Sequence, residues 1–401
     1  MDGYRLHMSQ FPSPTMRERL TGIAEEIGFV RAEHKYLKER LRELKSTSRN
    51  KAQPIESLRA PHVVIVPNEG ETFASFAPNE WNVYYQAAQS LREELGETSV
   101  SVFHVSPGED APVWHRRLID FITSRGATHI MGHVESDPGQ SGASWTWDVL
   151  WSELSEVWDG VFLGVMFDSS YKWLTAQTKL LARISPNFLL VDICMPMDGS
   201  LVRGRPEVGP INMPISRQTI ILLDERLESV EKHWDVSFVG AMYPYRVDLI
   251  AKLRSMGIDV AVNPHRADLA EDFATSRSDQ PSWLDYMAGL ASSRMTLNFS
   301  QSSAGRYVQL KTRVLEAGLA GALLLTDDLD RTSRFFVQDE EYGYFQDVEA
   351  LPSVIAEYLS APERLASIAA AGARRARQLA PTAFWYGIDA GLKNRRLRPI
   401  F

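Results

Sequence analysis

The sequence predicts an α/β protein with two Rossmann-like, doubly wound domains and an N-terminal helical segment. From His62 onward, short apolar runs alternate with helical patterns, and the same alternation restarts after the charged stretch at residues 224–235. Near-continuous apolar strands separated by helices are typical of a parallel sheet that helices cover on both faces. Ligands of such sheets bind at the carboxyl ends of the strands, so we expect functional residues there.

The N-terminal segment, residues 14–50, has the pattern of a coiled-coil helix. Its seam alternates steps of three and four residues, with His34 as the one polar member. The seam positions are Leu20, Ile23, Ile27, Val30, His34, Leu37, Leu41 and Leu44. This repeat favours a homodimer through a parallel coiled coil, and a single amphipathic helix folded back on its own subunit is the alternative.

Composition excludes several classes of protein. The chain has 401 residues, 44% of them hydrophobic, which is enough for two or three domains with sizeable cores. The 43 Lys and Arg against 51 Asp and Glu give a net charge of -8, which argues against a nucleic-acid partner. The single cysteine, Cys194, excludes an internal disulfide and fits a reducing compartment. With no run of about 18 apolar residues and no leader pattern, we expect a cytoplasmic protein.

Residues 60–215 are predicted to form the first domain. Strands are expected at 62–66, 99–105, 128–133, 161–167 and 188–193, with helices at 80–95, 113–125, 145–158 and 171–184 between them. Glu69, His133 and Asp168 each come just past a strand, where a ligand is expected.

Residues 235–380 are predicted to form the second domain, and residues 381–401 a C-terminal helix and basic tail. Strands are expected at 236–239, 259–262, 295–299 and 322–326, and helices at 246–256, 283–292, 312–319, 348–359 and 362–379. Neither domain has a Gly-x-Gly-x-x-Gly after its first strand, and no P-loop pattern is present. This disfavours a dinucleotide-dependent dehydrogenase and leaves an enzyme that binds a nucleotide in another way.

Four stretches of the second domain carry a family resemblance. They are "DVSFVGAMYPYRVDLIAKLRSMGIDV", "MTLNFS", "LKTRVLEAGLAGALLLTDDL" and "YGYFQDVEALPSVIAEYLSAPERLASIAAAGARRA". In this order they resemble the C-terminal half of group 1 glycosyltransferases, in the branch related to spore-maturation-protein glycosyltransferases. The resemblance implies a GT-B fold, in which two Rossmann-like domains face a cleft. It also implies that the second domain holds a nucleotide sugar and the first holds the acceptor.

The resemblance assigns the donor site to the start of a short helix at residues 313–320. It implies that Glu316 accepts hydrogen bonds from ribose hydroxyls and that Lys311 and Arg313 hold the diphosphate. A carboxylate near a helix N-terminus is electrostatically favoured and accepts from two adjacent hydroxyls, and the two cations suit phosphate oxygens. From the residues alone, a solvated helix face is the alternative for Glu316.

Four further residues are donor-site candidates. Gly240 allows close backbone approach after the first strand of the second domain, and Arg246 opens the next helix, where a diphosphate has room. Asn298 and Ser300 follow a strand and are suited to bind the nucleotide. The alternatives are an ordinary first-turn residue for Arg246 and loop capping for Asn298 and Ser300.

Catalysis of glycosyl transfer with inversion needs a base for the acceptor hydroxyl. Asp168 is the first candidate, and His133 and Glu69 are the second; the alternatives are a helix N-cap for Asp168 and a structural role for His133. The sequence Asp328-Leu329-Asp330 resembles the metal-binding Asp-x-Asp of another glycosyltransferase fold, but its position in the second domain does not fit that fold. We therefore expect no essential metal and no cofactor besides the nucleotide sugar.

The predicted function is a hexosyltransferase-type glycosyltransferase, which moves a sugar from a nucleotide-diphosphate sugar to a glycan, lipid-linked or protein acceptor. Two alternatives stay open: a non-hydrolysing sugar-nucleotide epimerase on the same fold, and a catalytically inactive scaffold in which the coiled coil is the working part.

Overall fold

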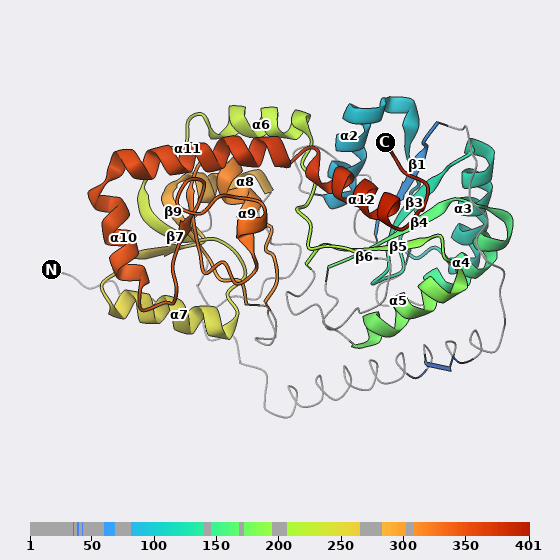
Figure 1. Ribbon diagram of the computed structural model, residues 1–401, viewed down its shortest axis with the longest axis horizontal. Helices are drawn as coiled ribbons and strands as arrows, with labels where there is room; N and C mark the ends of the chain where they lie inside the picture. The colour runs from blue at the N-terminus through green and yellow to red at the C-terminus, as the bar shows by residue number, and fades with distance from the viewer. Residues whose placement is uncertain are drawn as a thin grey trace.

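The computed structural model of the protein contains two parallel sheets, each covered by helices (Figure 1). The structure describes residues 60–68, 82–139, 146–167, 172–194, 207–264, 283–301 and 308–401, and the four exposed helical residues Lys35, Lys38, Glu39 and Arg42. Apart from these four, the predicted coiled coil at residues 14–50 lies outside the described residues. No helix in the described part of the chain is long and apolar enough to cross a membrane.

The N-terminal sheet has six parallel strands in the order β2-β1-β3-β4-β5-β6. The strands are β1 (Val63–Val66), β2 (Val100–Val102), β3 (His129–His133), β4 (Val161–Met166), β5 (Phe188–Asp192) and β6 (Glu207–Val208). The helices are α2 (Val83–Leu95), α3 (Ala111–Arg125), α4 (Thr146–Val157) and α5 (Lys172–Ile184). Alternate residues of β1 enter two separate apolar cores, which shows that both faces of the sheet are covered.

Close packing on this sheet depends on two glycines that pair across β3 and β4. Gly132 lies opposite Gly164. A Cβ atom at Gly132 would lie 2.3 Å from the Trp147 ring, and one at Gly164 would lie 2.6 Å from the Phe188 ring. The large rings of the helix layer and of the neighbouring strand therefore occupy the space that two side chains would otherwise take.

The C-terminal sheet has five parallel strands in the order β11-β10-β9-β7-β8. The strands are β7 (Trp234–Phe238), β8 (Val260–Val262), β9 (Ser293–Asn298), β10 (Leu323–Thr326) and β11 (Gly343–Tyr344). The helices are α7 (Pro244–Ser255), α8 (Trp283–Ala291), α9 (Arg313–Leu319), α10 (Leu351–Ser360) and α11 (Pro362–Leu379). The predicted α/β class with two doubly wound domains is confirmed.

One helix that the sequence analysis did not assign, α6 (Arg217–Leu227), joins the two domains. The side chain of Ser216 caps the start of α6, since it accepts a hydrogen bond from Thr219 N. Two side chains of α2, in the first domain, add further hydrogen bonds. Gln86 Oε1 accepts from Ser216 N at 2.9 Å, and the Glu93 carboxylate accepts from Arg217 N and Gln218 N at 2.8 and 3.0 Å. The start of α6 is therefore fixed to the N-terminal domain while its apolar side packs in the C-terminal core.

The last helix, α12 (Ala383–Asn394), returns to the N-terminal domain although it directly follows α11 (Figure 1). Phe384, Trp385 and Ile388 join one of the cores of the N-terminal sheet. Trp385 is fully buried, and its Nε1 donates to the carbonyl of Ala87 at 3.0 Å. The two chain crossings, before α6 and before α12, lie together because Ile215 N donates to Ala380 O at 2.9 Å.

We expect Trp385→Ala to lower the free energy of unfolding by about 3–5 kcal/mol, because it leaves a cavity under α12. Tyr386→Ala is the matched control, since Tyr386 is 49% exposed on the same helix and its loss should cost less than about 1 kcal/mol. Urea unfolding of both variants measures the difference. Equal losses would show that α12 is not part of the N-terminal core.

Candidate functional site

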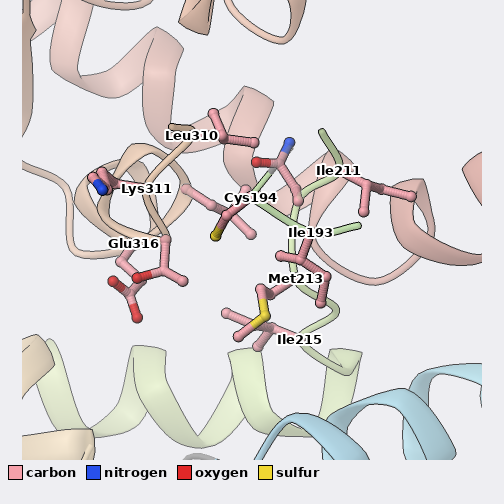
Figure 2. Close-up of a pocket in the computed structure, with 11 residues that line it drawn as sticks. Ile193, Cys194, Ile211, Met213, Ile215, Leu310, Lys311 and Glu316 are labelled. Atoms are coloured by element: carbon pink, nitrogen blue, oxygen red, sulfur yellow. The ribbon is translucent and has the colours of Figure 1, made fainter. Parts of the chain in front are cut away.

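A cavity lies where the two domains meet, beside the start of α9. Figure 2 shows Lys311 and Glu316 on one side of it and Ile193 and Met213 on the other. The C-terminal domain supplies the charged groups. The end of β5 and residues 211–215, which lead to α6, supply a largely apolar wall. The lining residues are Ile193, Cys194, Ile211, Asn212, Met213, Ile215, Leu310, Lys311, Thr312, Leu315 and Glu316.

Glu316 is buried, with 5% of its surface exposed. Its carboxylate accepts hydrogen bonds from two side chains of α8: Trp283 Nε1 donates at 3.2 Å and the Tyr286 hydroxyl at 2.9 Å. A solvated helix face, the alternative interpretation of Glu316, is therefore wrong.

Burial raises the pKa of the Glu316 carboxyl above its ordinary value. The hydrogen bonds from Trp283 and Tyr286 and the positive charge of Arg313 act in the opposite direction and favour the ionised form. The residue is thus a desolvated acid that the protein surrounds with donors and one cation.

Two arginines meet at the carboxyl end of β7, over the ring of Phe238. The guanidinium carbons of Arg313 and Arg246 lie 4.5 and 5.3 Å from the centre of this ring. Both arginines are buried, with 5% and 4% of their surface exposed. Burial, and then the positive charge of the neighbouring Arg313, lower the pKa of Arg246 below its ordinary value.

The partners of these arginines are mostly neutral. Arg246 Nε donates to the Tyr245 hydroxyl at 2.8 Å, and its Nη1 donates to the carbonyl of Ala241 at 2.7 Å. The Nε and Nη1 atoms of Arg313 are buried and have no hydrogen-bond partner in the structure. Because buried donors are normally paired, these two atoms are suited to an anionic ligand.

Gly240 gives Arg313 the space that it occupies. A Cβ atom at Gly240 would lie 2.1 Å from Arg313 Nη2, and the φ angle of 141° is one that other residues rarely adopt. The amide side chain of Asn263, after β8, holds this turn because it accepts from Gly240 N at 2.7 Å and donates to Gly240 O at 3.1 Å. The structure thus brings together Gly240, Arg246 and Arg313, three of the predicted donor-site residues.

Asn298 and Ser300, at the end of β9, bond to the loop that follows β10. Asn298 Nδ2 donates to Thr326 Oγ1 and Asp330 Oδ2 at 3.0 and 3.2 Å, while its Oδ1 is buried without a partner. The Ser300 hydroxyl donates to Asp327. These contacts hold the loop in place, in line with the capping alternative for the pair.

The sequence Asp328-Leu329-Asp330, which resembles a metal-binding Asp-x-Asp motif, lies in this loop. Asp328 accepts from Ser333 N at 2.8 Å, and Asp330 accepts from Thr332 N and Oγ1 at 3.1 and 2.8 Å. Burial raises the pKa of Asp330 to about 6. Both carboxylates therefore cap turns. In the part of the chain that the structure describes, no group of three or more His, Cys, Asp or Glu is placed to hold a metal ion.

In the N-terminal domain, His133 ends β3 and takes part in a hydrogen-bonded chain. Its Nδ1 is bonded to the Tyr84 hydroxyl at 2.5 Å, and its Nε2 to Glu135 Oε2 at 3.0 Å. Glu135 Oε1 also accepts from Phe167 N, past the end of β4, at 2.6 Å. The other two catalytic candidates, Glu69 and Asp168, lie outside the described residues.

The sequence analysis missed the side chains that hold the charged groups. Trp283 and Tyr286 stand three residues apart on α8, so their shared face was predictable from the helix period, but their contact with Glu316 was not. Lys311, which was predicted, lines the cavity and donates to Gln309 Oε1 at 3.3 Å.

Residues 229–381 match the family model described as glycosyl transferase-like. No curated protein sequence matches the chain. Among solved structures, the fold is similar to a sucrose-phosphate synthase from Thermosynechococcus elongatus, with TM-score 0.50, 12% identity and coverage of 84% of this chain and 99% of that one. It is also similar to an alpha-glucosyltransferase in complex with UDP and a 13-mer DNA containing a HMU base, with TM-score 0.52, 10% identity and coverage of 83% and 100%.

The same glucosyltransferase in complex with UDP-glucose and DNA containing an abasic site gives TM-score 0.51 at 10% identity, covering 83% of this chain and 100% of that one. At these identities the likeness shows the fold. The predicted GT-B fold is confirmed, and residues 229–381 form a glycosyl transferase-like domain. The spore-maturation branch stays a prediction.

We expect Glu316→Gln to remove a pH-dependent loss of stability. The native pKa of Glu316 is raised above the ordinary value of 4.5, so the native state binds more protons than the unfolded state as soon as pH exceeds that value. The free energy of unfolding therefore falls as pH rises from about 4.5 through the native pKa. Gln keeps an oxygen for Trp283 and a donor for the Tyr286 hydroxyl.

Urea unfolding between pH 4 and pH 8 tests this expectation. The stability of the variant relative to the wild type should increase with pH, and the exposed Glu363→Gln should show no such trend. A flat difference for Glu316→Gln would mean that the carboxylate is fully compensated in the native state.

Proposed function

We propose that the protein transfers a sugar from a nucleoside diphosphate sugar to an acceptor bound by the N-terminal domain. The observation that carries this proposal is the buried pair of Arg246 and Arg313, which meets beside Glu316 within the glycosyl transferase-like domain. Two desolvated cations with neutral partners are an energetically costly arrangement that a diphosphate relieves.

In this proposal, the diphosphate lies against the free Nε and Nη1 atoms of Arg313 and near Arg246. Lys311, which lines the same cavity as Glu316, adds a further positive charge. The carboxylate of Glu316 accepts hydrogen bonds from Trp283 and Tyr286, and its two oxygens together offer about four lone-pair positions. Glu316 can therefore bind two adjacent ribose hydroxyls while Trp283 and Tyr286 keep it in place.

Bond cleavage leaves additional negative charge on the departing diphosphate. Fixed guanidinium groups in a water-poor site stabilise such charge without reorganisation. The protein's own cations therefore supply this stabilisation, which supports a reaction with no essential metal and no cofactor.

On the acceptor side, we propose His133 as the base for a reaction that inverts the anomeric centre. Both ring nitrogens are already bonded, Nε2 to Glu135 and Nδ1 to the Tyr84 hydroxyl. In this proposal the proton therefore passes through Tyr84: the acceptor hydroxyl gives its proton to the Tyr84 oxygen as the Tyr84 proton moves to His133 Nδ1. Glu69 and Asp168, also expected past strand ends, remain proposed alternatives. A glycan, a lipid-linked sugar and a protein are the proposed acceptor classes.

We expect Arg313→Gln to weaken binding of the nucleoside diphosphate by about 1.5–3 kcal/mol and to leave binding of the bare nucleoside unchanged, because only the diphosphate loses a charged partner. Arg313→Lys should lose less, since the charge remains while the planar fork is lost. A thermal-shift panel with UDP, GDP and ADP selects the ligand, and calorimetry gives the affinities.

Arg364→Gln, which removes an exposed cation of α11, is the control and should change neither affinity. Equal losses for nucleoside and diphosphate would place Arg313 away from the diphosphate. Turnover of the nucleotide sugar without an acceptor would favour the epimerase, and no nucleotide binding at all would favour the inactive scaffold.

We further propose that residues 14–50 join two copies of the chain through a parallel coiled coil. Deletion of residues 1–50 should convert a dimer into a monomer that still binds nucleotide, as sedimentation and calorimetry can measure. Association of the full chain should weaken below about pH 6.5, because a pair of His34 rings in the seam disfavours double protonation. A monomeric full-length chain, or a truncated chain that still dimerises, would contradict this arrangement.

A further inference from the structure

A second groove lies on the C-terminal domain, away from the donor site. It has a volume of about 460 Å³, which is in the range of small-molecule sites. The end of α10 and the first half of α11 form one wall, and the amino-terminal edge of the C-terminal sheet forms the other. Figure 1 shows this corner at the end of the molecule that is distant from the N-terminal domain.

The wall on α11 is apolar and built of small residues. Leu365, Ala366, Ala369 and Ala370 line it at helical spacing, and the ring of Tyr358 on α10 continues it. Ala366 and Ala370 are exposed, so the groove is open along the helix. This wall is suited to an extended apolar chain.

Two cations line the opposite wall, Lys232 just before β7 and Arg294 in β9. Lys232 Nζ donates to the carbonyls of Ser293 and Gly321, both at 2.9 Å. Lys232 is an exposed residue, but the protein around its ammonium group partly desolvates it and lowers the pKa of Lys232 to about 8. No carboxylate of the described residues counteracts this effect. Two of the three ammonium hydrogens are thus held by the protein, and the third is left for a ligand.

The charge of this wall indicates what kind of head group it takes. Arg294 Nη1 lies 3.3 Å from Asp235 Oδ1, so one of the two cations is already paired. One positive charge remains uncompensated. A carboxylate matches it, whereas a phosphate monoester carries about −1.5 to −2 at neutral pH and would face Asp235 with an excess of negative charge.

We propose that this groove binds a fatty acid, with its carboxylate on Lys232 and Arg294 and its alkyl chain along Ala366, Ala369 and Ala370 of α11. The two walls supply the two halves of the recognition: an ammonium group fixed by backbone carbonyls for the head, and an open apolar helix face for the chain. The site is independent of the donor cavity, since the two share no lining residue.

Isothermal titration calorimetry of the full-length protein with dodecanoate, below its micellar concentration, tests the proposal. We expect one site per chain. Ala370→Phe, which fills the groove from an exposed position, and Lys232→Met, which keeps the stem but removes the charge, should each weaken dodecanoate at least about tenfold. Lys252→Met removes an exposed cation of α7 and should leave the affinity unchanged.

Comparison ligands separate the head group from the chain. Dodecanol should bind more weakly than dodecanoate to the wild type. Because dodecanol carries no charge, Lys232→Met should bind dodecanol as tightly as the wild type does. Saturating UDP should not displace dodecanoate. The proposal fails if dodecanoate does not bind, if Ala370→Phe binds it as the wild type does, if UDP competes with it, or if dodecyl phosphate binds more tightly than dodecanoate.

Discussion

Burial of Arg246, Arg313 and Glu316 at one end of the C-terminal sheet is the constraint on which the C-terminal domain depends. Charges that leave water must be compensated, and here the compensation comes from an aromatic face, a tyrosine hydroxyl and backbone carbonyls more than from opposite charge. Glu316 balances part of the positive charge, and α8 holds it in place with two side-chain donors. The packing of α8 against α9 is therefore also the support of the site.

The same constraint extends into the backbone. Arg313 reaches the end of β7 only because residue 240 has no side chain, and the left-handed turn there is held by both polar atoms of Asn263. Asn263 itself has a φ of 43°, which asparagine tolerates better than most residues. Two chain turns, after β7 and after β8, are thus shaped around one guanidinium group, and neither would be required by a nucleotide site without a buried cation.

Much of the fold was predictable because strands such as β1, β4 and β10 are short apolar runs. The two-residue strands β6 and β11 were not predicted. Helix α6 was not predicted either, since most of its apolar residues form one unbroken run at 220–223 and charged residues follow them. Its position depends on contacts with α2 and α8, which lie far away in the sequence. For the candidate site, the residue types in the sequence indicated the chemistry, but the sequence did not decide whether Glu316 is buried. Whether Glu316 faces solvent depends on Trp283 and Tyr286, about 30 residues earlier, and no local pattern encodes that contact.

Arg246 and Arg313 place two positive charges in the candidate site before a ligand binds. In the proposed reaction, such a site favours the products, in which the departing diphosphate carries more negative charge than the sugar nucleotide does. A sugar nucleotide brings a diphosphate diester, and cleavage of the sugar bond adds negative charge to the departing diphosphate. Burial, together with the repulsion from Arg313, lowers the pKa of Arg246. This unfavourable energy is offset more fully as the negative charge of the diphosphate grows. Interactions that strengthen toward the transition state accelerate a reaction, whereas equal binding of substrate and transition state does not. In the proposed transfer, the costly burial of two arginines therefore contributes to the rate of the reaction as well as to binding.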